Sequence, residues 1–364
     1  MQLTNRERFN RTLRFEPVDR CPIWHVGEWA ETLTRWHREG LPVDVSDVVA
    51  YLGFDYRGNM DMNVELDPPF ETEVLEEDEH TIVQRRGDGA VVRAFKKGHG
   101  KSMPQWLDWP VRTRDDWEAL KERLRPDTPG RVAAGIEELR GEWASRDYPL
   151  MLRAGSFYGV LRQWIGVEQL SVLFYDDPAW IHDMMAHLAD LYVGIIERIL
   201  PYCDPAPDFA GFWEDMCYKT GPLIGPDLFR EFMIPNYRKV TELLRARGID
   251  AIFVDSDGNI EKLIPHWLEG GVNGFHPLEV ASGMDPVALR KQYGQDIVLR
   301  GGIDKRLVAR GGEAMRAEVL AKVPFLAKSG GYIPYVDHDV PPDVSWANFT
   351  DYAELLRQAA AMRE

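Results

Sequence analysis

Two aspartates, Asp255 and Asp257, directly follow a run of apolar residues in the second half of the chain. Carboxylates and imidazoles are ligands that Zn²⁺, Mn²⁺, Fe²⁺ and Mg²⁺ accept, and Glu214 and His338 could complete such a set. The alternative is that the two aspartates only cap a helix predicted over residues 260–269. The sequence leaves both interpretations open, and the candidate metal ligands are Asp255, Asp257 and His338.

Polar side chains follow the ends of eight apolar stretches in this chain. In chain order they are His25 and Glu28, Asn59 and Asp61, Arg153 and Ser156, Glu214 and Asp215, Asp255 and Asp257, His276 and Glu279, Asp304 and Lys305, Asp337 and His338. Histidine and carboxyl groups exchange protons when their surroundings tune their pKa values. The candidate catalytic groups are His276, His25, Asp61 and Glu214. The candidate substrate-binding groups are Arg153, Glu28, Lys305 and Glu279.

Residues 301–305, with the sequence GGIDK, follow an apolar stretch and open a predicted helix. Such a turn can present backbone N–H groups to a carboxylate or a phosphate, and Lys305 adds positive charge. The glycines could equally serve a tight turn alone. A similar ambiguity applies to His276, which precedes Pro277 and could be a packed imidazole that bonds a backbone group.

The elements that must position these side chains are apolar strands that alternate with helices. The predicted strands cover residues 21–26, 54–59, 149–157, 208–215, 251–257, 273–279, 296–304 and 331–339. About eight strands in this order indicate a single (β/α)8 barrel over residues 1–364, with the polar residues around one mouth. A doubly wound open sheet is the alternative, but no G-x-G-x-x-G follows the first strand.

The residues at about 71–110 have a different pattern from the rest of the chain. Polar and apolar residues alternate there, and a turn is indicated at Gly87-Asp88-Gly89. This pattern predicts an inserted β-hairpin, followed by a long loop. Loops of this length inside a compact domain often serve as lids, binding loops or partner surfaces.

The composition is typical of a globular protein, with 45% hydrophobic and 28% charged residues and a formal net charge of −16. This charge argues against binding to nucleic acid or to an anionic membrane surface, because phosphates require a positive footprint. Three widely spaced cysteines suit a reducing compartment. The first residues are polar and basic and resemble neither a signal peptide nor a membrane helix, so we expect a cytoplasmic protein with a small-molecule substrate.

The run IFVDSDGN also has the form of the haloacid dehalogenase nucleophile motif, in which an apolar strand leads to DxDG and the first aspartate is phosphorylated. That motif normally opens its domain. Here only about 110 residues follow it, and at least three strands in the same rhythm precede it. This interpretation is therefore disfavoured.

Five stretches together resemble the uroporphyrinogen decarboxylase superfamily. They are NRERFNRTLRFEPVDRCPIW, FWEDMCYKTGPLIGPDLFREFMIPNYRKV, VDSDGN with LIPHWLEGGVNGFHPLE, LRGGIDKRLVARGG, and GGYIPYVDHDVPPDVS. The superfamily includes the haem-pathway decarboxylase and methyltransferases that move methyl groups between corrinoid proteins and thiols. The resemblance spans nearly the whole chain and implies a (β/α)8 barrel with its site at the carboxyl ends of the strands.

Two departures from the family patterns bear on the branch. The haem-pathway decarboxylases carry an RQAGR-type stretch after the first strand, whose arginines bind substrate carboxylates, and this chain has HVGEWAETLTRW there. The zinc methyltransferases have His-x-Cys and a late cysteine where this chain has Asp255-x-Asp257 and, near the late strand, His338. The resemblance therefore implies a metal site without thiolates, for zinc or another divalent metal.

Three hypotheses follow. In the first, the chain is a methyltransferase-like enzyme whose metal is held by Asp257 and His338 with Asp255 or Glu214, whose acid or base is His276 or His25, and whose partner is a corrinoid protein docked near the hairpin. In the second, it is a decarboxylase of a carboxylated small molecule or tetrapyrrole, with Arg153, Arg162 or Lys305 binding carboxylates and Asp61 donating a proton. In the third, it is a non-catalytic ligand-binding barrel. Family habits imply a monomer or a homodimer.

Overall fold

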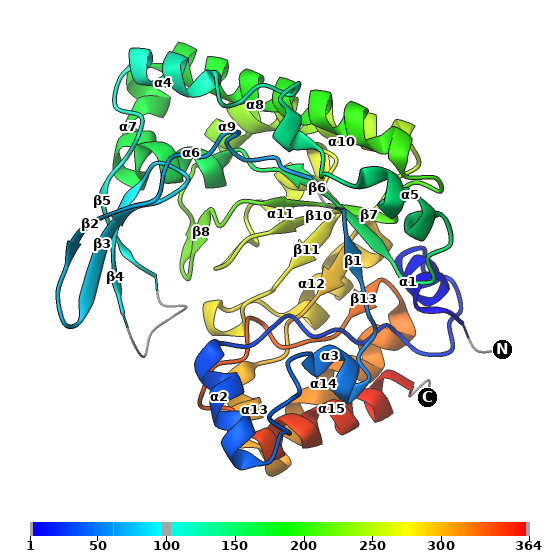
Figure 1. Ribbon diagram of the computed structural model, residues 1–364. Helices are drawn as coiled ribbons and strands as arrows, with labels where there is room; N and C mark the ends of the chain where they lie inside the picture. Colours follow the sequence, from blue (N-terminus) through cyan, green and yellow to red (C-terminus); the bar gives the residue numbers. More distant parts are fainter. Residues whose placement is uncertain (1–2, 61, 97–102, 362–364) are drawn as a thin grey trace.

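The computed structural model describes residues 3–60, 62–96 and 103–361 (Figure 1). Its centre is a curled parallel sheet of seven strands in the order β1-β6-β7-β10-β11-β12-β13. The strands are β1 (Gly58–Asn59), β6 (Leu150–Gly155), β7 (Phe209–Trp213), β10 (Ile252–Asp255), β11 (Gly274–His276), β12 (Val298–Arg300) and β13 (Tyr332–Ile333). The parallel strands and the crossover helices between them confirm the predicted α/β class.

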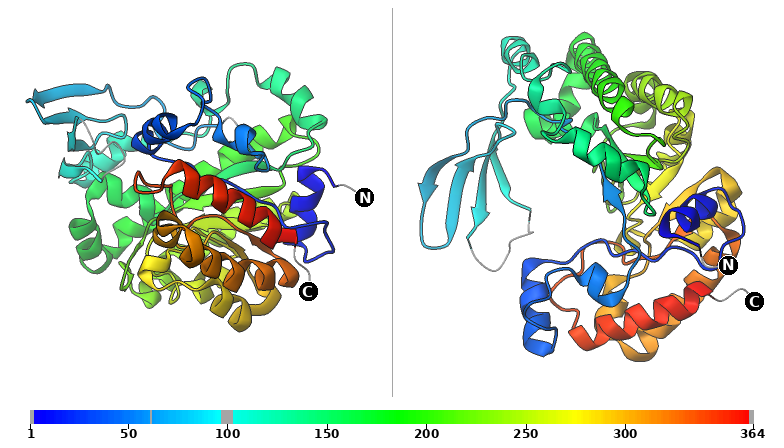
Figure 2. Two further views of the ribbon diagram at one scale, coloured as in Figure 1. Left: turned by 90° about the horizontal axis from the view of Figure 1, so that it is seen from below. Right: turned by 45° about the vertical axis from the view of Figure 1, so that its right-hand side comes forward.

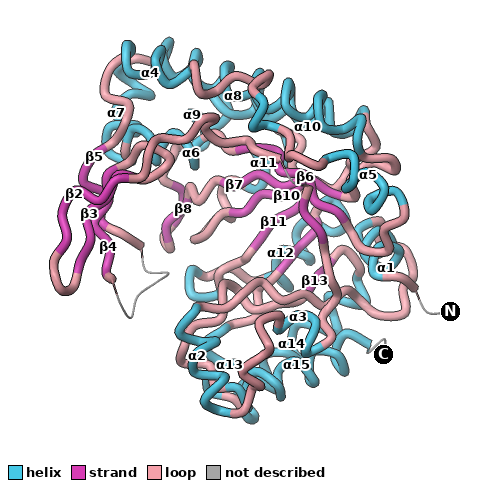
Figure 3. Tube along the Cα trace, in the orientation of Figure 1, coloured by secondary structure: helices cyan, strands magenta, loops and turns pink. Residues whose placement is uncertain are grey.

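Helices surround this sheet on its outer side (Figure 3). They are α1 (Asn5–Leu13), α2 (Ala30–Glu39), α3 (Val48–Leu52), α4 (Arg114–Lys121), α5 (Ile136–Ala144), α6 (Tyr158–Ile165), α7 (Val167–Asp176), α8 (Pro178–Ile199), α9 (Pro226–Leu228), α10 (Ile234–Ala246), α11 (Ile264–Glu269), α12 (Pro286–Tyr293), α13 (Lys305–Arg310), α14 (Gly312–Ser329) and α15 (Trp346–Ala361). Strands with helices over them become almost fully buried, which explains apolar runs such as residues 252–254. Among the described residues, no helix combines the length and apolar character needed to cross a bilayer.

The first predicted strand, residues 21–26, is wrong as a strand, because this segment is extended but irregular. The backbone here still makes contacts on both sides. Asp55 donates its N–H to the carbonyl oxygen of Ile23, and Val340 donates its N–H to the carbonyl oxygen of Gly27, the residue just after the segment. The N–H of Ile23, however, bonds the Asp55 carboxylate at 2.8 Å rather than a strand. The Asp55 side chain thus takes the hydrogen bond that a neighbouring strand would otherwise make. For this reason residues 21–26 do not add an eighth strand to the seven-stranded sheet.

The segment in which the sequence predicts a hairpin forms a separate antiparallel sheet of four strands, which projects from the body (Figure 2). Its strands are β2 (Glu73–Glu77), β3 (Thr81–Arg85), β4 (Val91–Phe95) and β5 (Gln105–Asp108). The turn at Gly87-Asp88-Gly89 lies between β3 and β4, and Gly89 adopts a positive φ of 87°. We call this unit the appended sheet. A short ribbon of β8 (Cys217–Tyr218) and β9 (Gly221–Pro222) follows β7.

A buried ionic cluster stabilises the end of the sheet where the strands begin. Asp208, immediately before β7, accepts hydrogen bonds from Arg6, Asn10, Arg146 and the N–H of Leu150. The side chains of Asp208 and Arg146 are 2% and 0% exposed. This cluster ties α1 to β6 and β7 at the amino ends of the strands, so the carboxyl ends remain available for chemistry.

Candidate active site

A cavity of about 610 Å³ opens between the central sheet and the turn of the appended sheet. Its walls include Arg86 and Asp88 from that turn and Trp164 from α6. Its floor is polar, with Asp255, His276, Arg57 and Arg300 among the lining residues. The volume is in the range of about 300–1,000 Å³ that is usual for small-molecule sites.

Three aspartates meet at the carboxyl ends of β7 and β10. Carboxylate oxygens of Asp215, Asp255 and Asp257 lie within 4.8 Å of one another, and we call them the acidic cluster. Asp255 is the last residue of β10 and Asp215 follows β7, its parallel neighbour. Asp215 adopts a positive φ of 41°, and its Oδ1 accepts the N–H of Asp257 at 3.3 Å. Such backbone strain in a non-glycine residue is typical of functional sites.

The positive groups that contact the acidic cluster, Arg162 at Asp215 and His338 at Asp257, only partly offset its negative charge. Burial and the charges of Asp215 and Asp257 raise the pKa of Asp255 to about 8. Burial and the charge of Asp257 raise the pKa of Asp215 to about 6, although Arg162 works against this shift. Since 41% of the Asp255 side chain is accessible, water in the cavity moderates the effect of burial. The repulsion among three close carboxylates therefore contributes to the raised pKa values even where water reaches the side chains, and a bound cation would relieve it.

His338 borders the acidic cluster from the other side. Its Nε2 lies 3.5 Å from Oδ2 of Asp257. The hydrogen bond with Asp257 raises the pKa of His338. The structure thus places two of the predicted metal ligands, Asp255 and Asp257, in one cluster with Asp215, and the third, His338, beside Asp257. The donor set of oxygens and one imidazole nitrogen fits a hard or borderline divalent cation.

The helix-cap interpretation of the two aspartates is wrong. The helix α11 begins at Ile264, and its N-terminal cap position is Leu263, which makes no side-chain capping bond. Residues 261–263 form a turn instead. Neither aspartate caps α11: Asp255 lines the cavity, and Asp257 lies beside His338.

His276 lies on the cavity floor next to the acidic cluster. Its Nδ1 is 3.6 Å from Oδ1 of Asp255. Burial, together with the charges of Arg300 and Arg57, holds the pKa of His276 well below its usual value. A neutral imidazole can accept a hydrogen bond or a proton from a bound molecule.

Glu214 points away from the acidic cluster. Its buried carboxylate accepts the N–H groups of Phe157 and Gly159, each at 2.9 Å, and the hydroxyl of Tyr237 at 2.7 Å. Burial raises the pKa of Glu214 to about 7, and these hydrogen bonds oppose that shift. The contacts indicate that Glu214 anchors the start of α6, where the first N–H groups lack helical partners.

The remaining predicted residues have varied surroundings. His25 pairs with Glu28 at 2.5 Å, its ring is 5.7 Å from that of Phe54, and neither partner lines the cavity. Glu279 accepts the N–H of Gly258 at 2.9 Å and so supports the loop after β10. Asp61 lies outside the described residues.

The predicted cations divide between the cavity and the loops. Arg153 lines the cavity but is 44% exposed and paired with Glu65 at 2.7 Å. Arg162 pairs with Asp215 at 3.2 Å. The backbone N–H of Lys305 bonds the buried carboxylate of Asp337 at 3.2 Å, which joins the loops after β12 and β13.

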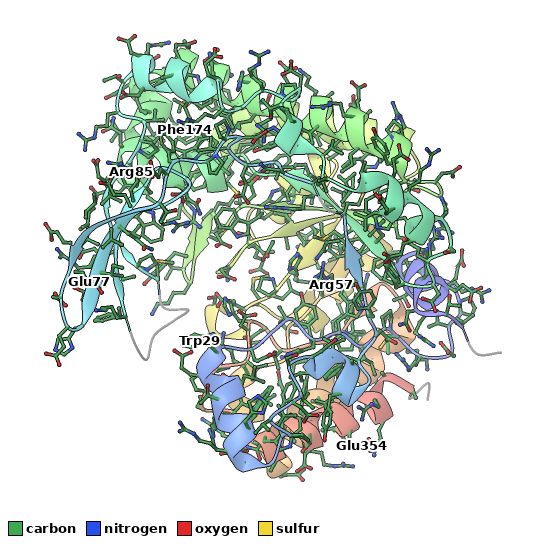
Figure 4. The ribbon with its side chains drawn as sticks, viewed as in Figure 1. Trp29, Arg57, Glu77, Arg85, Phe174 and Glu354 are labelled. Carbon is green, nitrogen blue, oxygen red and sulfur yellow. The ribbon has the colours of Figure 1, made fainter. Side chains whose placement is uncertain are left out.

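Two arginines of the cavity floor, Arg57 and Arg300, are absent from the sequence-based candidates. Arg300 ends β12, and its guanidinium carbon lies 4.9 Å from the ring centres of both Trp24 and Phe253. Figure 4 shows Arg57 beside β1, near the middle of the molecule. The sequence did contain a signal for Arg300, because a charged residue at the end of an apolar, buried strand is unusual and suggests a functional role.

Comparison with known proteins gives one family. A family model described as Uroporphyrinogen decarboxylase (URO-D) matches residues 95–359. A uroporphyrinogen decarboxylase from Alcanivorax borkumensis is 22% identical over 357 residues, 93% of either chain. Another from Anaeromyxobacter dehalogenans is 24% identical over 322 residues, 85% of this chain and 88% of that one.

Among solved structures, a methyltransferase from Methanosarcina mazei has a similar fold. Its TM-score is 0.60 at 13% sequence identity, and the match covers 98% of this chain and 99% of that one. At this identity the likeness concerns the fold alone.

Proposed function

The chain belongs to the uroporphyrinogen decarboxylase (URO-D) family, and on that premise we propose that it is a metal-dependent methyltransferase-like enzyme that moves a methyl group between a small molecule and a corrinoid protein or a thiol. The observation that carries this proposal is the acidic cluster of Asp215, Asp255 and Asp257 beside the cavity. We assign these three aspartates and His338 as the residues that hold a divalent cation. When bound, the cation would supply Lewis acidity that lowers the pKa of a small acceptor.

The residues of the cavity have separate roles in this proposal. His276, held neutral, can accept a hydrogen bond from the acceptor and so orient it beside the acidic cluster. Arg162 holds Asp215 at 3.2 Å and so fixes the orientation of that carboxylate. Tyr237 and Glu214 keep the start of α6 in place beneath the cavity wall. The aromatic side chains Trp164 and Trp213 of the lining exclude water from the substrate.

The proposed corrinoid partner docks at the cavity mouth, beside the appended sheet. Val74 and Leu75 of β2 are 52% and 42% exposed, which provides apolar surface for such a contact. A homodimer that buries the same strands is the competing assignment of this surface.

The experiment that tests the proposal has two readouts. Metal content is measured by mass spectrometry on protein purified without chelator, for wild type, Asp257→Ala and His338→Ala. Asp227→Ala, which removes a 97% exposed carboxylate, is the control. Anaerobic demethylation of methylcobalamin, as a surrogate for the corrinoid protein, is then followed by its absorbance with a thiol acceptor.

We expect stoichiometric metal in wild type and in Asp227→Ala, loss of metal in the two site variants, and demethylation that follows metal content. Wild-type protein that takes up no metal, even after anaerobic reloading, would refute the metal assignment. Metal binding without any methyl exchange would refute methyl transfer with these substrates.

A second candidate function is decarboxylation of a carboxylated small molecule, and the observation that favours it is the set of arginines in the cavity, Arg57, Arg153 and Arg300. Guanidinium groups can hold substrate carboxylates while a bond to another carboxylate breaks. Release of CO₂ that is abolished by Arg153→Ala would favour this function. If no porphyrinogen releases CO₂, the haem-pathway version is wrong. Binding without any turnover would instead support the non-catalytic barrel.

A further inference from the structure

Arg300 and Arg57 form a positive pole on the cavity floor. Arg300 is only 4% exposed and is enclosed by aromatic rings, including those of Trp24 and Tyr335, whose ring centres lie 4.9 and 5.8 Å from its guanidinium carbon. Arg57 lies over the same Trp24 ring at 5.4 Å. Both arginines line the cavity, so a molecule inside it can reach them.

The charge of this pole has no ionic partner within the described residues. The Nε and Nη1 atoms of Arg300 are buried without a hydrogen-bond acceptor. Neither Arg300 nor Arg57 lies within 4.0 Å of any described carboxylate, and Arg57 bonds only the neutral Asn59 side chain, at 3.2 Å. A buried guanidinium without a counter-ion is costly, and native proteins seldom retain one without a functional reason.

The neighbouring titratable groups do not compensate this charge. Asp255 also lines the cavity, but its carboxylate forms no ion pair with either arginine and belongs to the acidic cluster. Burial and the charge of Arg300 lower the pKa of Arg57 to about 10, as expected for two unpaired cations in proximity. By contrast, Arg153 and Arg162 have their own carboxylates, Glu65 and Asp215.

We propose that Arg300 and Arg57 form a subsite for the carboxylate of a small organic acid, and that this acid is the substrate of the cavity. The free donors of Arg300 take the carboxylate oxygens, and Arg57 adds the second positive charge. The apolar body of the acid lies against Phe212 and Trp213 of the wall. A carboxylate on such a body suits aromatic surroundings better than a strongly hydrated phosphate does.

The subsite rests on the proposed function only in assigning the substrate to this cavity. Because Asp255 belongs both to the floor and to the acidic cluster, an acid held at the arginines lies with its body beside the cluster. The subsite therefore names the class of the small molecule that exchanges the methyl group, namely a carboxylic acid. Binding can be measured in the presence of chelator, without turnover.

The test is calorimetric titration with benzoate at neutral pH in the presence of chelator. The ligands are benzoate, its uncharged analogue benzamide, and inorganic phosphate. The proteins are wild type, Arg300→Met and Arg57→Met. The control Arg86→Met removes a guanidinium that lines the outer wall and is paired with Asp88 at 2.8 Å.

We expect benzoate to bind wild type and to lose at least about tenfold in affinity in Arg300→Met and in Arg57→Met, with a change of less than about threefold in Arg86→Met. Benzamide should bind wild type at least about tenfold more weakly than benzoate. Arg300→Met should melt at the same temperature as wild type or higher, because it removes an unpaired buried charge, and this separates loss of the subsite from misfolding.

Four outcomes would overturn the subsite. They are benzoate that fails to bind wild type at about 10 mM, equal affinity for benzoate and benzamide, unchanged benzoate affinity in Arg300→Met, and phosphate that binds at Arg300 more tightly than benzoate. The last result would assign the pole to a phosphate. Benzoate binding that persists when methyl exchange is absent would retain the subsite and refute only the methyl transfer.

Discussion

Oδ2 of Asp257 lies 3.5 Å from Nε2 of His338. Asp257 follows β10 and His338 follows β13, and two strands, β11 and β12, lie between them in the sheet. The contact is possible because the sheet curls, so that loops from separated strands meet over its carboxyl edge. The acidic cluster is thus bordered by an imidazole from the last strand, and the geometry of the candidate metal site depends on the curl.

This contact makes a prediction about His338. Because the Asp257 carboxylate favours the imidazolium, Asp257→Asn should lower the pKa of His338 in chelator-treated protein, as measured by NMR titration of the ring proton. A histidine with a raised folded pKa adds stability that is present below about pH 6.5 and is lost as the pH rises through the folded pKa. Asp227→Asn, which changes a 97% exposed carboxylate outside the acidic cluster, should leave the titration unchanged. An unaltered His338 titration in Asp257→Asn would contradict the contact.

The repulsion within the acidic cluster predicts that Asp255→Asn stabilises the metal-free protein. The folded pKa of Asp255 is raised from 3.8 to about 8, so the folded state keeps a proton that the unfolded state releases, and stability falls as the pH rises between about 4 and 8. The free energy of unfolding of Asp255→Asn minus that of wild type should therefore increase across this window. Denaturant titrations in chelator at several pH values measure it. A difference independent of pH would contradict the repulsion.

The loop after β10 depends on Gly258, which is next to Asp257. Gly258 has a φ of +83°, and a Cβ atom there would lie 2.6 Å from the Cys217 carbonyl oxygen. Gly248 has nearly the same φ, +81°, but open space around it. Gly248→Ala should cost about 1–2 kcal/mol, and Gly258→Ala should cost clearly more and also weaken metal binding. Thermal unfolding and metal content measure both, and equal costs would show that the backbone at Gly258 is not constrained by Cys217.

Much of the fold could be predicted because its signals are local. The helix α8 begins at Pro178, directly after Asp177, whose side chain caps it, and both residues favour a helix start. The apolar run of β10 likewise indicates a buried strand. The failure at residues 21–26 has a non-local cause, since the Asp55 carboxylate takes the N–H of Ile23. No pattern within the segment itself reports that contact.

The candidate site was predicted where a strand end determines the place of a side chain. Asp255 ends β10, and Asp257 and His338 come after parallel strands whose carboxyl ends share one edge. The choice between Glu214 and Asp215 could not be made from the sequence, because adjacent residues point to opposite sides and the register decides which one joins the acidic cluster. Arg300 was missed because its proposed role depends on two guanidinium nitrogens that have no hydrogen-bond acceptor among the described residues. Only the packing around the side chain reveals this.

The buried ionic cluster around Asp208, at the amino ends of the strands, should affect stability without affecting the candidate active site. Asp208 is 2% exposed and pairs with the fully buried Arg146, so Asp208→Ala leaves a buried cation without its partner. We expect a loss of about 3–5 kcal/mol in the free energy of unfolding. Metal content and benzoate affinity should stay at wild-type values at a temperature where the variant is folded. If either property fell together with stability, the two ends of the sheet would be coupled.

The anchor of α6 gives a prediction with a matched tyrosine as its control. The hydroxyl of Tyr237 donates to Oε1 of Glu214 at 2.7 Å, and the side chain is fully buried. Tyr237→Phe leaves the buried carboxylate with one donor fewer, so it should cost about 1–3 kcal/mol in urea unfolding. Tyr352 is equally enclosed, but its hydroxyl has no hydrogen-bond partner among the described residues. Tyr352→Phe should therefore be neutral or stabilising, because it removes an unsatisfied polar group. Equal costs for the two variants would mean that the stability of the buried Glu214 carboxylate does not depend on Tyr237.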